Sequence, residues 1–241
     1  NIQEQIYFKG GKKIPFLNES ITFNKEFLPF HPNGITFRGF CKGEEISMET
    51  FYSIGGGFIV QEKDTLEKQA RLDDILFPYP ILKAIELESY CENENLSIST
   101  IVYKNELVLK NAAKIDFELN RIWQVMLESM YLGCHTEGEL PGGLHVKRRA
   151  FDIHAKLIKG TSHTNPEDWM TAIRSTKVKF REILKWVSCF ALSVNEVNAS
   201  LGRVVTAPTN GSAGVIPAVL MYYLVIENHE ADFEHIKKFL L

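Results

Sequence analysis

Three segments of this chain place glycine, hydroxyl and acidic residues together in ways that a plain apolar core does not require. The first, Ser53–Phe58, contains three consecutive glycines. Such a run is typical of a close backbone approach to a ligand, and equally of a bulge or loop. In the second, Cys134–Gly143, Glu137 lies between Thr136 and Gly138. A carboxylate on a loop between two helices could act as a general acid or base, or it could belong to a simple polar connection.

The third segment, Arg203–Val215, is an apolar run that enters a Pro-Thr-Asn-Gly-Ser loop and then opens an apolar helix. The first N–H groups of a helix have no internal partners, and together with nearby hydroxyl and amide groups they form a cradle for an anion. A carboxylate or a phosphate would suit it, although a well-capped buried helix would use the same residues. No Gly-Lys-Ser/Thr follows, so the segment is not a phosphate-binding P-loop.

Short β-branched and aromatic runs precede Glu62 and predict strands. They are Ile14–Phe16, Ile21–Phe23, Ile35–Phe40 and Ile46–Val60, the last interrupted by the glycines. The charged, aperiodic residues that follow indicate a linker.

Beyond Pro78 the pattern is helical. An apolar stripe over Leu119–Met130 predicts a long helix, and Gly133 offers it a left-handed C-terminal stop. Asn165 and Pro166 predict a second helix start, with a helix or helix pair running on toward Gly202. Val215–Ile226 is predicted to be a buried helix.

Composition narrows the class of protein. The formal net charge is −3, and the longest basic run, Lys147–Arg149, is interpreted as a solvated helix face, so we expect no nucleic-acid partner. No apolar run reaches eighteen residues and no signal peptide is visible, so we expect no membrane span and a cytoplasmic protein. Because the chain starts at Asn1 rather than Met and stops at Leu241 within an amphipathic pattern, we expect it to be part of a longer protein.

The cysteines are far apart in sequence and form no Cys-x-x-Cys pair, and no histidine lies at zinc-finger spacing. A disulfide framework is not expected, and each cysteine is predicted to be a small buried hydrophobe. They are Cys41, Cys91, Cys134 and Cys189.

Four blocks of the chain resemble the iron–sulfur-dependent L-serine dehydratase family. Leu28–Gly34 is similar to its Leu-Pro-x-His-x-Asn-Gly motif, and Thr50–Val60 to its glycine segment. Thr136–Ala150 resembles its Thr-Glu-Gly-x-Leu-Pro-Gly pattern with the Arg-Arg-Ala end. A further block comprises Asn195–Ala199 followed by Gly202–Ala218. The blocks follow the family's order along nearly the whole chain.

The resemblance implies an α+β fold. Residues 1–62 would be the C-terminal portion of a small α+β domain, 63–77 a linker, and 78–241 the N-terminal portion of an all-helical catalytic domain. The family's early Ser-Ser-Ser-His-Thr segment is not matched, and we interpret Thr161–Thr164 as a coincidental likeness to it.

The family also implies the elimination of water from L-serine to pyruvate and ammonia. An iron of a four-iron four-sulfur cluster would act as Lewis acid for the hydroxyl group. The cluster's cysteines would lie in blocks beyond Leu241, so no metal ligand is assigned in this chain. Ser212-Ala213-Gly214 stands where some members have Ala-Cys-Gly.

His31 and Glu137 are the predicted acid/base groups, and a homodimer is a further expectation. A pyridoxal-phosphate dehydratase and a non-catalytic serine-sensing module remain alternatives, although no lysine has a convincing Schiff-base context. The residues assigned to substrate binding are Ser53, Gly55, Gly56, Thr136, Gly138, Asn198, Thr206, Pro208, Thr209, Asn210, Gly211 and Ser212.

Overall fold

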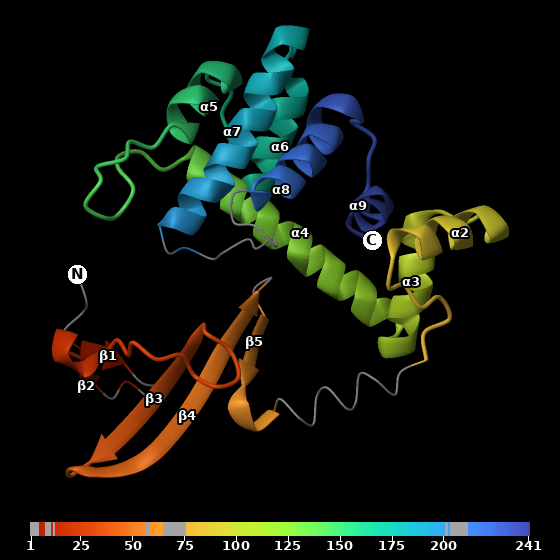
Figure 1. The fold of residues 1–241 in the computed structure, drawn as a ribbon. Coiled ribbons are helices and arrows are strands. Elements are labelled where there is room, and N and C mark those ends of the chain that lie inside the picture. The colour runs from red at the N-terminus through yellow and green to blue at the C-terminus, as the bar shows by residue number, and fades with distance from the viewer. Residues whose placement is uncertain are drawn as a thin grey trace. The chain divides into compact units, whose positions relative to one another are not determined.

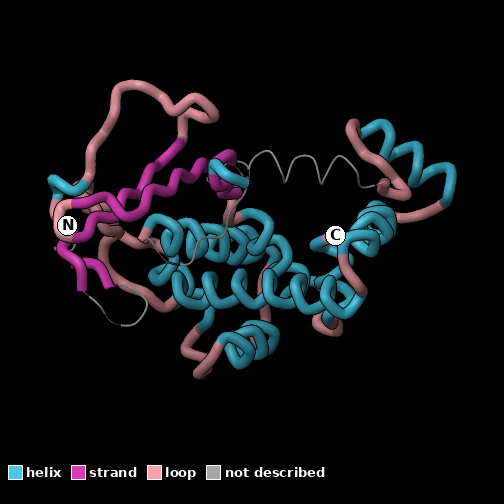
Figure 2. The backbone as a smooth tube through the Cα atoms, turned by 90° about the horizontal axis from the view of Figure 1, so that it is seen from below, coloured by secondary structure: helices cyan, strands magenta, loops and turns pink. Residues whose placement is uncertain are grey.

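The computed structural model describes residues 5–7, 11, 13–55, 58–64, 76–200, 202 and 212–241. The chain divides into two compact units, Asn1–Ala70 and Arg71–Leu241. In the described residues, the strands lie in the first unit and the α-helices in the second (Figures 1 and 2), which confirms the α+β class. The predicted bounds of the linker, 63–77, stay a prediction.

The first unit contains a two-stranded and a three-stranded antiparallel sheet, the latter in the order β3-β4-β5. The turn between β3 and β4 uses left-handed conformations at Lys42 (φ 52°) and Gly43 (φ 88°). Ile21–Phe23, predicted as a strand, is irregular. Apolar character alone did not make it a strand, since Phe23 is 92% exposed and buries nothing against a partner. The strands are β1 Gln5–Tyr7, β2 Lys13–Pro15, β3 Gly34–Cys41, β4 Glu44–Gly55 and β5 Phe58–Gln61, with short 3-10 turns η1 Asn18–Ser20 and η2 Glu62–Asp64.

Tyr52 of β4 is the buried centre of this unit, with no exposed surface. Its ring packs on Phe30 at 4.9 Å between centroids, and its hydroxyl donates to Glu62 Oε1 at 2.9 Å. A side chain at Gly34 would come within 2.5 Å of Leu28 Cδ1 and 3.0 Å of the Tyr52 ring. The loop that precedes β3 is therefore held tightly against β4.

The second unit is built around α4, which contains the predicted apolar stripe and confirms that helix. Helices α5, α6, α7 and α8 pack toward its C-terminal half, and α3 and α9 pack near its N-terminal end (Figure 1). Among the described residues, no helix combines the length and the apolar character that a membrane span requires. The elements are α2 Ala84–Glu94, α3 Ile98–Leu109, α4 Ala112–Cys134, α5 Ala150–Ile158, α6 Pro166–Ser175, α7 Phe180–Ala199, α8 Val215–Tyr222, the π-helical turn η4 Tyr223–Glu227, and α9 Phe233–Leu240.

Helix α6 begins as predicted. The Asn165 side chain accepts a hydrogen bond from the Asp168 N–H at 2.8 Å, and Pro166 occupies the first turn. The predicted helix pair that follows consists of α6 and α7, and the predicted apolar helix from Val215 is α8 continued by η4.

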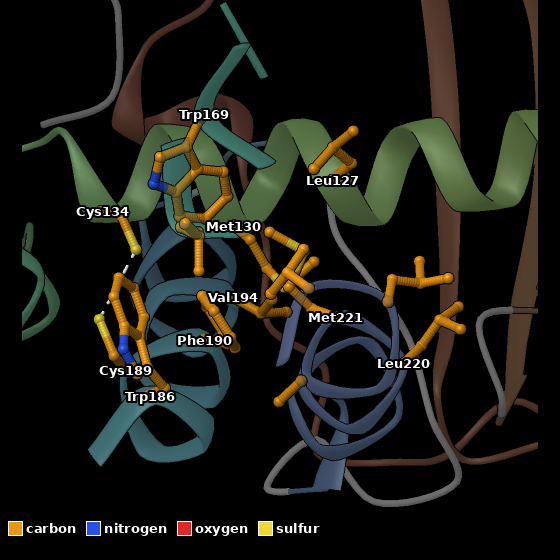
Figure 3. Close-up of a cluster of buried hydrophobic side chains, with 14 of the residues drawn as sticks. Leu127, Met130, Cys134, Trp169, Trp186, Cys189, Phe190, Val194, Leu220 and Met221 are labelled. Carbon is orange, nitrogen blue, oxygen red and sulfur yellow. Dashed lines mark hydrogen bonds between the residues drawn. The ribbon is translucent and has the colours of Figure 1, made fainter. Parts of the chain in front are cut away.

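Large apolar side chains of α4, α6, α7 and α8 meet in one core, drawn in Figure 3. Cys134 and Cys189 lie inside it with their sulfur atoms 3.7 Å apart, so the prediction of buried cysteines is confirmed for these two. It is wrong for Cys41, which is exposed on the small three-stranded sheet, and Cys91 on α2 is only partly buried.

The prediction that Gly133 stops α4 in a left-handed conformation is wrong. Gly133 lies within the helix and is buried, and a Cβ there would come within 2.7 Å of the Ser193 backbone carbonyl carbon of α7. At Gly214 a Cβ would similarly meet the Ala191 backbone carbon at 3.0 Å. Both glycines therefore allow close contact with the backbone of α7.

Candidate functional site

The segment between α4 and α5 forms a small hairpin. Leu140 N donates to Val146 O at 2.8 Å, and Arg148 N donates to Gly138 O at 2.9 Å. Gly138 (φ 97°) and Gly142 (φ 121°) adopt backbone conformations that side chains disfavour. These two glycines are thus needed for the hairpin itself, whatever it binds.

Glu137 lies exposed at the start of the hairpin. The neighbouring Thr136 hydroxyl donates to Leu132 O at 2.7 Å and so closes the end of α4. Lys147 Nζ donates to Asp152 Oδ2 at 2.9 Å. That hydrogen bond raises the pKa of Lys147, and the Glu137 charge adds a smaller contribution in the same direction. The structure therefore has the predicted carboxylate on a loop between helices, with a cation nearby.

The prediction of a solvated basic face is wrong for Arg148. This residue is only 8% exposed, and its Nη2 donates to Ser200 Oγ. Its Nε is buried and has no hydrogen-bond partner among the described residues. A buried guanidinium with a spare donor is well suited to binding a carboxylate. The pairing of the hairpin strands, which turns Arg148 toward α7, is not visible in the sequence.

Glu196 of α7 is a second residue that sequence reasoning did not assign. It is 5% exposed, and its Oε1 accepts hydrogen bonds from Arg149 N at 2.7 Å and Ala150 N at 3.3 Å. These N–H groups begin α5, whose own N-cap residue provides no side-chain bond. The carboxylate therefore caps α5 and complements the positive end of its dipole, fixing the hairpin's exit to α7.

The end of α7 contributes further polar groups beside Arg148. The Ser200 hydroxyl, which Arg148 contacts, donates to Glu196 O at 2.6 Å. Asn198, predicted to bind substrate, lies partly buried on the same helix. A polar layer thus joins the hairpin to the C-terminal turn of α7.

The predicted anion cradle is described only at its end. Ser212 is partly buried and precedes α8, whose N-cap is Gly214 without a side-chain cap bond. The helix begins at Val215, as predicted. The other predicted members lie outside the described residues; they are Thr206, Pro208, Thr209, Asn210 and Gly211.

In the first unit, His31 and Ser53 are linked through hydrogen bonds to Asn33. Asn33 N donates to His31 Nδ1 at 3.2 Å, and Ser53 N donates to Asn33 O at 2.9 Å. Because Nδ1 accepts, the neutral ring carries its proton on Nε2, which can donate to a ligand. Gly55 ends β4, and Gly56 lies outside the described residues.

The cysteines do not form a cluster site. Cys41 and Cys91 lie on β3 and α2, and Cys134 and Cys189 form one buried pair. Burial raises the pKa of the Cys134 thiol, and the contact with Cys189 raises it further. A four-iron four-sulfur cluster requires several converging thiolates, so the cysteines of this chain do not fit one. Among the described residues, His135, His154 and His163 form a different group that could hold a metal ion.

Comparison with protein families matches nearly the whole chain. Residues 1–64 match the serine dehydratase beta chain, and residues 93–241 match the serine dehydratase alpha chain. The second match includes the hairpin, Arg148 and Glu196.

Three curated relatives illustrate the similarity. The L-serine dehydratase TdcG of Escherichia coli is 41% identical over 207 residues, which cover 85% of this chain and 42% of the relative. The L-serine dehydratase of Haemophilus influenzae is 37% identical over 216 residues, or 89% and 44% of the two chains. That of Streptomyces coelicolor is 36% identical over 240 residues, or 98% and 49%. The chain thus spans about half the length of the relatives it matches.

Proposed function

Because the chain belongs to the serine dehydratase family, we propose that the protein containing it is a lyase that removes water from L-serine to give pyruvate and ammonia. The observation that carries this proposal is the family match through the hairpin and α7, the segments that contain Glu137, Arg148 and Glu196. The relatives with this similarity carry the name L-serine dehydratase.

The substrate's carboxylate would be bound at the end of α7. Arg148 offers a buried guanidinium whose Nε has no partner among the described residues, and Ser200 holds it from one side. The predicted cradle from Thr206 to Ser212 follows Ser200 in the sequence, and we propose that it contributes to binding the same carboxylate. A charge-assisted contact of this kind fixes orientation as well as affinity.

Loss of the α-proton requires a positioned base. In the helical unit we assign this role to Glu137, which lies exposed on a hairpin held at both ends by backbone bonds. His31, held at its own turn by Asn33, remains the candidate of the first unit.

We propose that the cofactor is the four-iron four-sulfur cluster implied by the family resemblance, with its cysteine ligands outside this chain. The cysteines present here do not converge, so we assign none of them to the cluster and derive no step through it. L-serine is the proposed substrate, and the homodimer remains an expectation.

The test uses the complete protein that contains this chain, purified without oxygen and assayed for pyruvate from L-serine. Glu137→Gln should lower kcat/KM by at least about 100-fold, as expected for loss of a general base. The matched control is Glu139→Gln in the same hairpin. Glu139 contacts His145 on the exposed surface, so this variant should keep wild-type kinetics.

Three outcomes would contradict the proposal. Activity that survives air and iron chelation but requires pyridoxal phosphate, with its violet absorption band, would favour the pyridoxal-phosphate alternative. Binding of serine without release of pyruvate would favour a sensing module. Equal effects of Glu137→Gln and Glu139→Gln would remove Glu137 from the mechanism.

A further inference from the structure

Three histidines from separate segments converge at one end of α4. His135 directly follows α4, His154 lies on α5, and His163 lies on the loop between α5 and α6. One ring nitrogen of each lies within 4.8 Å of the others. His154 is buried, whereas His135 and His163 are partly exposed, so an ion could reach the group from solvent.

The hydrogen bonds of two of these rings settle their tautomers. His135 Nδ1 lies 2.6 Å from Tyr131 O, and His163 Nδ1 lies 2.9 Å from Thr161 O. A carbonyl oxygen only accepts, so each Nδ1 carries a hydrogen and each neutral ring has its lone pair on Nε2. Histidines that ligate metals are oriented by this kind of bond from the second nitrogen to a carbonyl.

The two Nε2 atoms face each other at 2.6 Å. Two lone pairs at this separation repel unless a positive species lies between them. A proton could do so by making one ring cationic. A metal ion bound to both nitrogens would do so as well.

The third ring, His154, is also neutral. Its Nε2 accepts a hydrogen bond from Trp169 Nε1 at 2.8 Å. If Nε2 of His154 bound a metal ion, its lone pair would go to the ion. If Nδ1 bound the ion instead, Nε2 would carry the proton of the neutral ring. The Trp169 indole would lose its acceptor in both cases.

We propose that His135, His154 and His163 form a binding site for one divalent transition-metal ion of the zinc class. The donors are three neutral imidazoles, which suit zinc, cobalt, nickel and copper ions and lack the oxygen ligands that calcium and magnesium require. The site joins the end of α4 to α5 and to the loop before α6. It does not depend on the proposed dehydratase activity.

The geometry requires two adjustments. With Zn–N bonds of about 2.0–2.1 Å and tetrahedral angles, ligating nitrogens lie roughly 3.4 Å apart. The His135 and His163 nitrogens would have to separate by about 0.8 Å from their 2.6 Å contact, while His154 would have to approach. His163 lies on a loop, so it can move without displacing a helix. A fourth position would stay open to water.

The test titrates zinc chloride into the chelator-treated 241-residue chain by calorimetry, and cobalt chloride by visible absorption. We expect one ion per chain and the visible bands of tetrahedral cobalt without a thiolate charge-transfer band. A thiolate band would show that cysteines, rather than this histidine group, bind the ion. Fluorescence of Trp169 should change in step with binding, because its indole hydrogen bond to His154 is broken.

His163→Ala should weaken zinc binding by at least about 100-fold, since even loss of a second-sphere partner costs 10–100-fold. Its loop position should leave the fold intact, as circular dichroism would show. His135→Gln provides a second variant at a partly exposed position. The matched control is His229→Ala, an exposed histidine outside the group, which should bind zinc like the wild type.

Two results would overturn the proposal. One is the absence of stoichiometric zinc or cobalt binding by the intact chain, which would leave a proton shared between His135 and His163. The other is binding by His163→Ala as tight as that of the wild type. Neither result bears on pyruvate formation, so failure here is distinguishable from failure of the proposed function.

Discussion

Replacement of Gly133 by alanine should destabilise the helical unit, although alanine is the better helix former. Gly133 lies where α4 crosses α7, and a Cβ would stand 2.7 Å from both the carbonyl carbon and the Cα of Ser193. Ordinary contacts begin at 3.4 Å and the Ser193 carbonyl oxygen is nearer still, so the two helices would have to separate by more than about 0.7 Å. The atoms in the way belong to backbone and cannot rotate aside.

The expected loss of stability follows from two opposing effects. Overpacking of a core costs roughly 1–3 kcal/mol, and the rigid backbone here favours the upper end, about 3 kcal/mol. Replacement of glycine by alanine within a helix stabilises the helix by about 1 kcal/mol, because alanine has the higher helix propensity. The net destabilisation is therefore about 2 kcal/mol, which corresponds to a fall in Tm of roughly 4–8 °C for a unit of this size.

Urea and thermal unfolding followed by far-UV circular dichroism would measure the effect. The control is Gly143→Ala, where a Cβ meets nothing within 4 Å and φ is not positive; stability should change by less than about 0.5 kcal/mol. A Gly133→Ala protein as stable as the wild type, or more stable, would refute the reasoning, because helix propensity would then outweigh the crossing contact.

Three further predictions concern other residues. Glu196→Ala should lower the free energy of unfolding by about 2–3 kcal/mol, because buried N–H groups of α5 lose their acceptor. Glu196→Gln keeps an oxygen and should lower it less. Equal losses for the two variants in urea titrations would argue against the cap. In the native protein, aromatic disulfide reagents should modify exposed Cys41 quickly, but Cys134 and Cys189 only on unfolding. Burial raises the pKa of Cys134 and so suppresses its reactive thiolate. Rapid modification of all thiols in the native protein would contradict this prediction. Asn210→Ala in the complete protein should lower kcat/KM for serine by roughly tenfold or more, while changing the free energy of unfolding by only about 1 kcal/mol. If the variant unfolds but its folded fraction has normal kinetics, the loop has a structural role and does not bind substrate.

Local signals predicted α4 and the start of α6. The stripe of α4 and the Asn165 cap of α6 each depend on neighbours within a few residues, so the sequence contains the information directly. The prediction for Gly133 failed because a left-handed stop and a close helix crossing both require glycine, and only the partner backbone distinguishes them. The prediction of a strand at Ile21–Phe23 was wrong for a similar reason, since a strand depends on a neighbouring strand as much as on its own residues.

The polar groups of the site were harder to foresee. Glu137 could be singled out because its loop breaks a helical pattern. Arg148 and Glu196 acquire their roles only when the hairpin packs on α7, and no local pattern marks them. The histidine group gave no signal at all, because its members come from three segments without metal-ligand spacing.

The bond from Glu196 to the start of α5 also sets an order of events during synthesis. Glu196 lies 46 residues beyond Ala150. At about 5–20 residues per second, it leaves the ribosome roughly 2–9 s later. Helix α5 has nine residues, fewer than the ~12–15 below which an isolated helix is marginal in water. Until α7 has emerged, α5 therefore lacks both its cap and a major packing partner. We expect Leu157 and Ile158 to be accessible to a chaperone during those seconds.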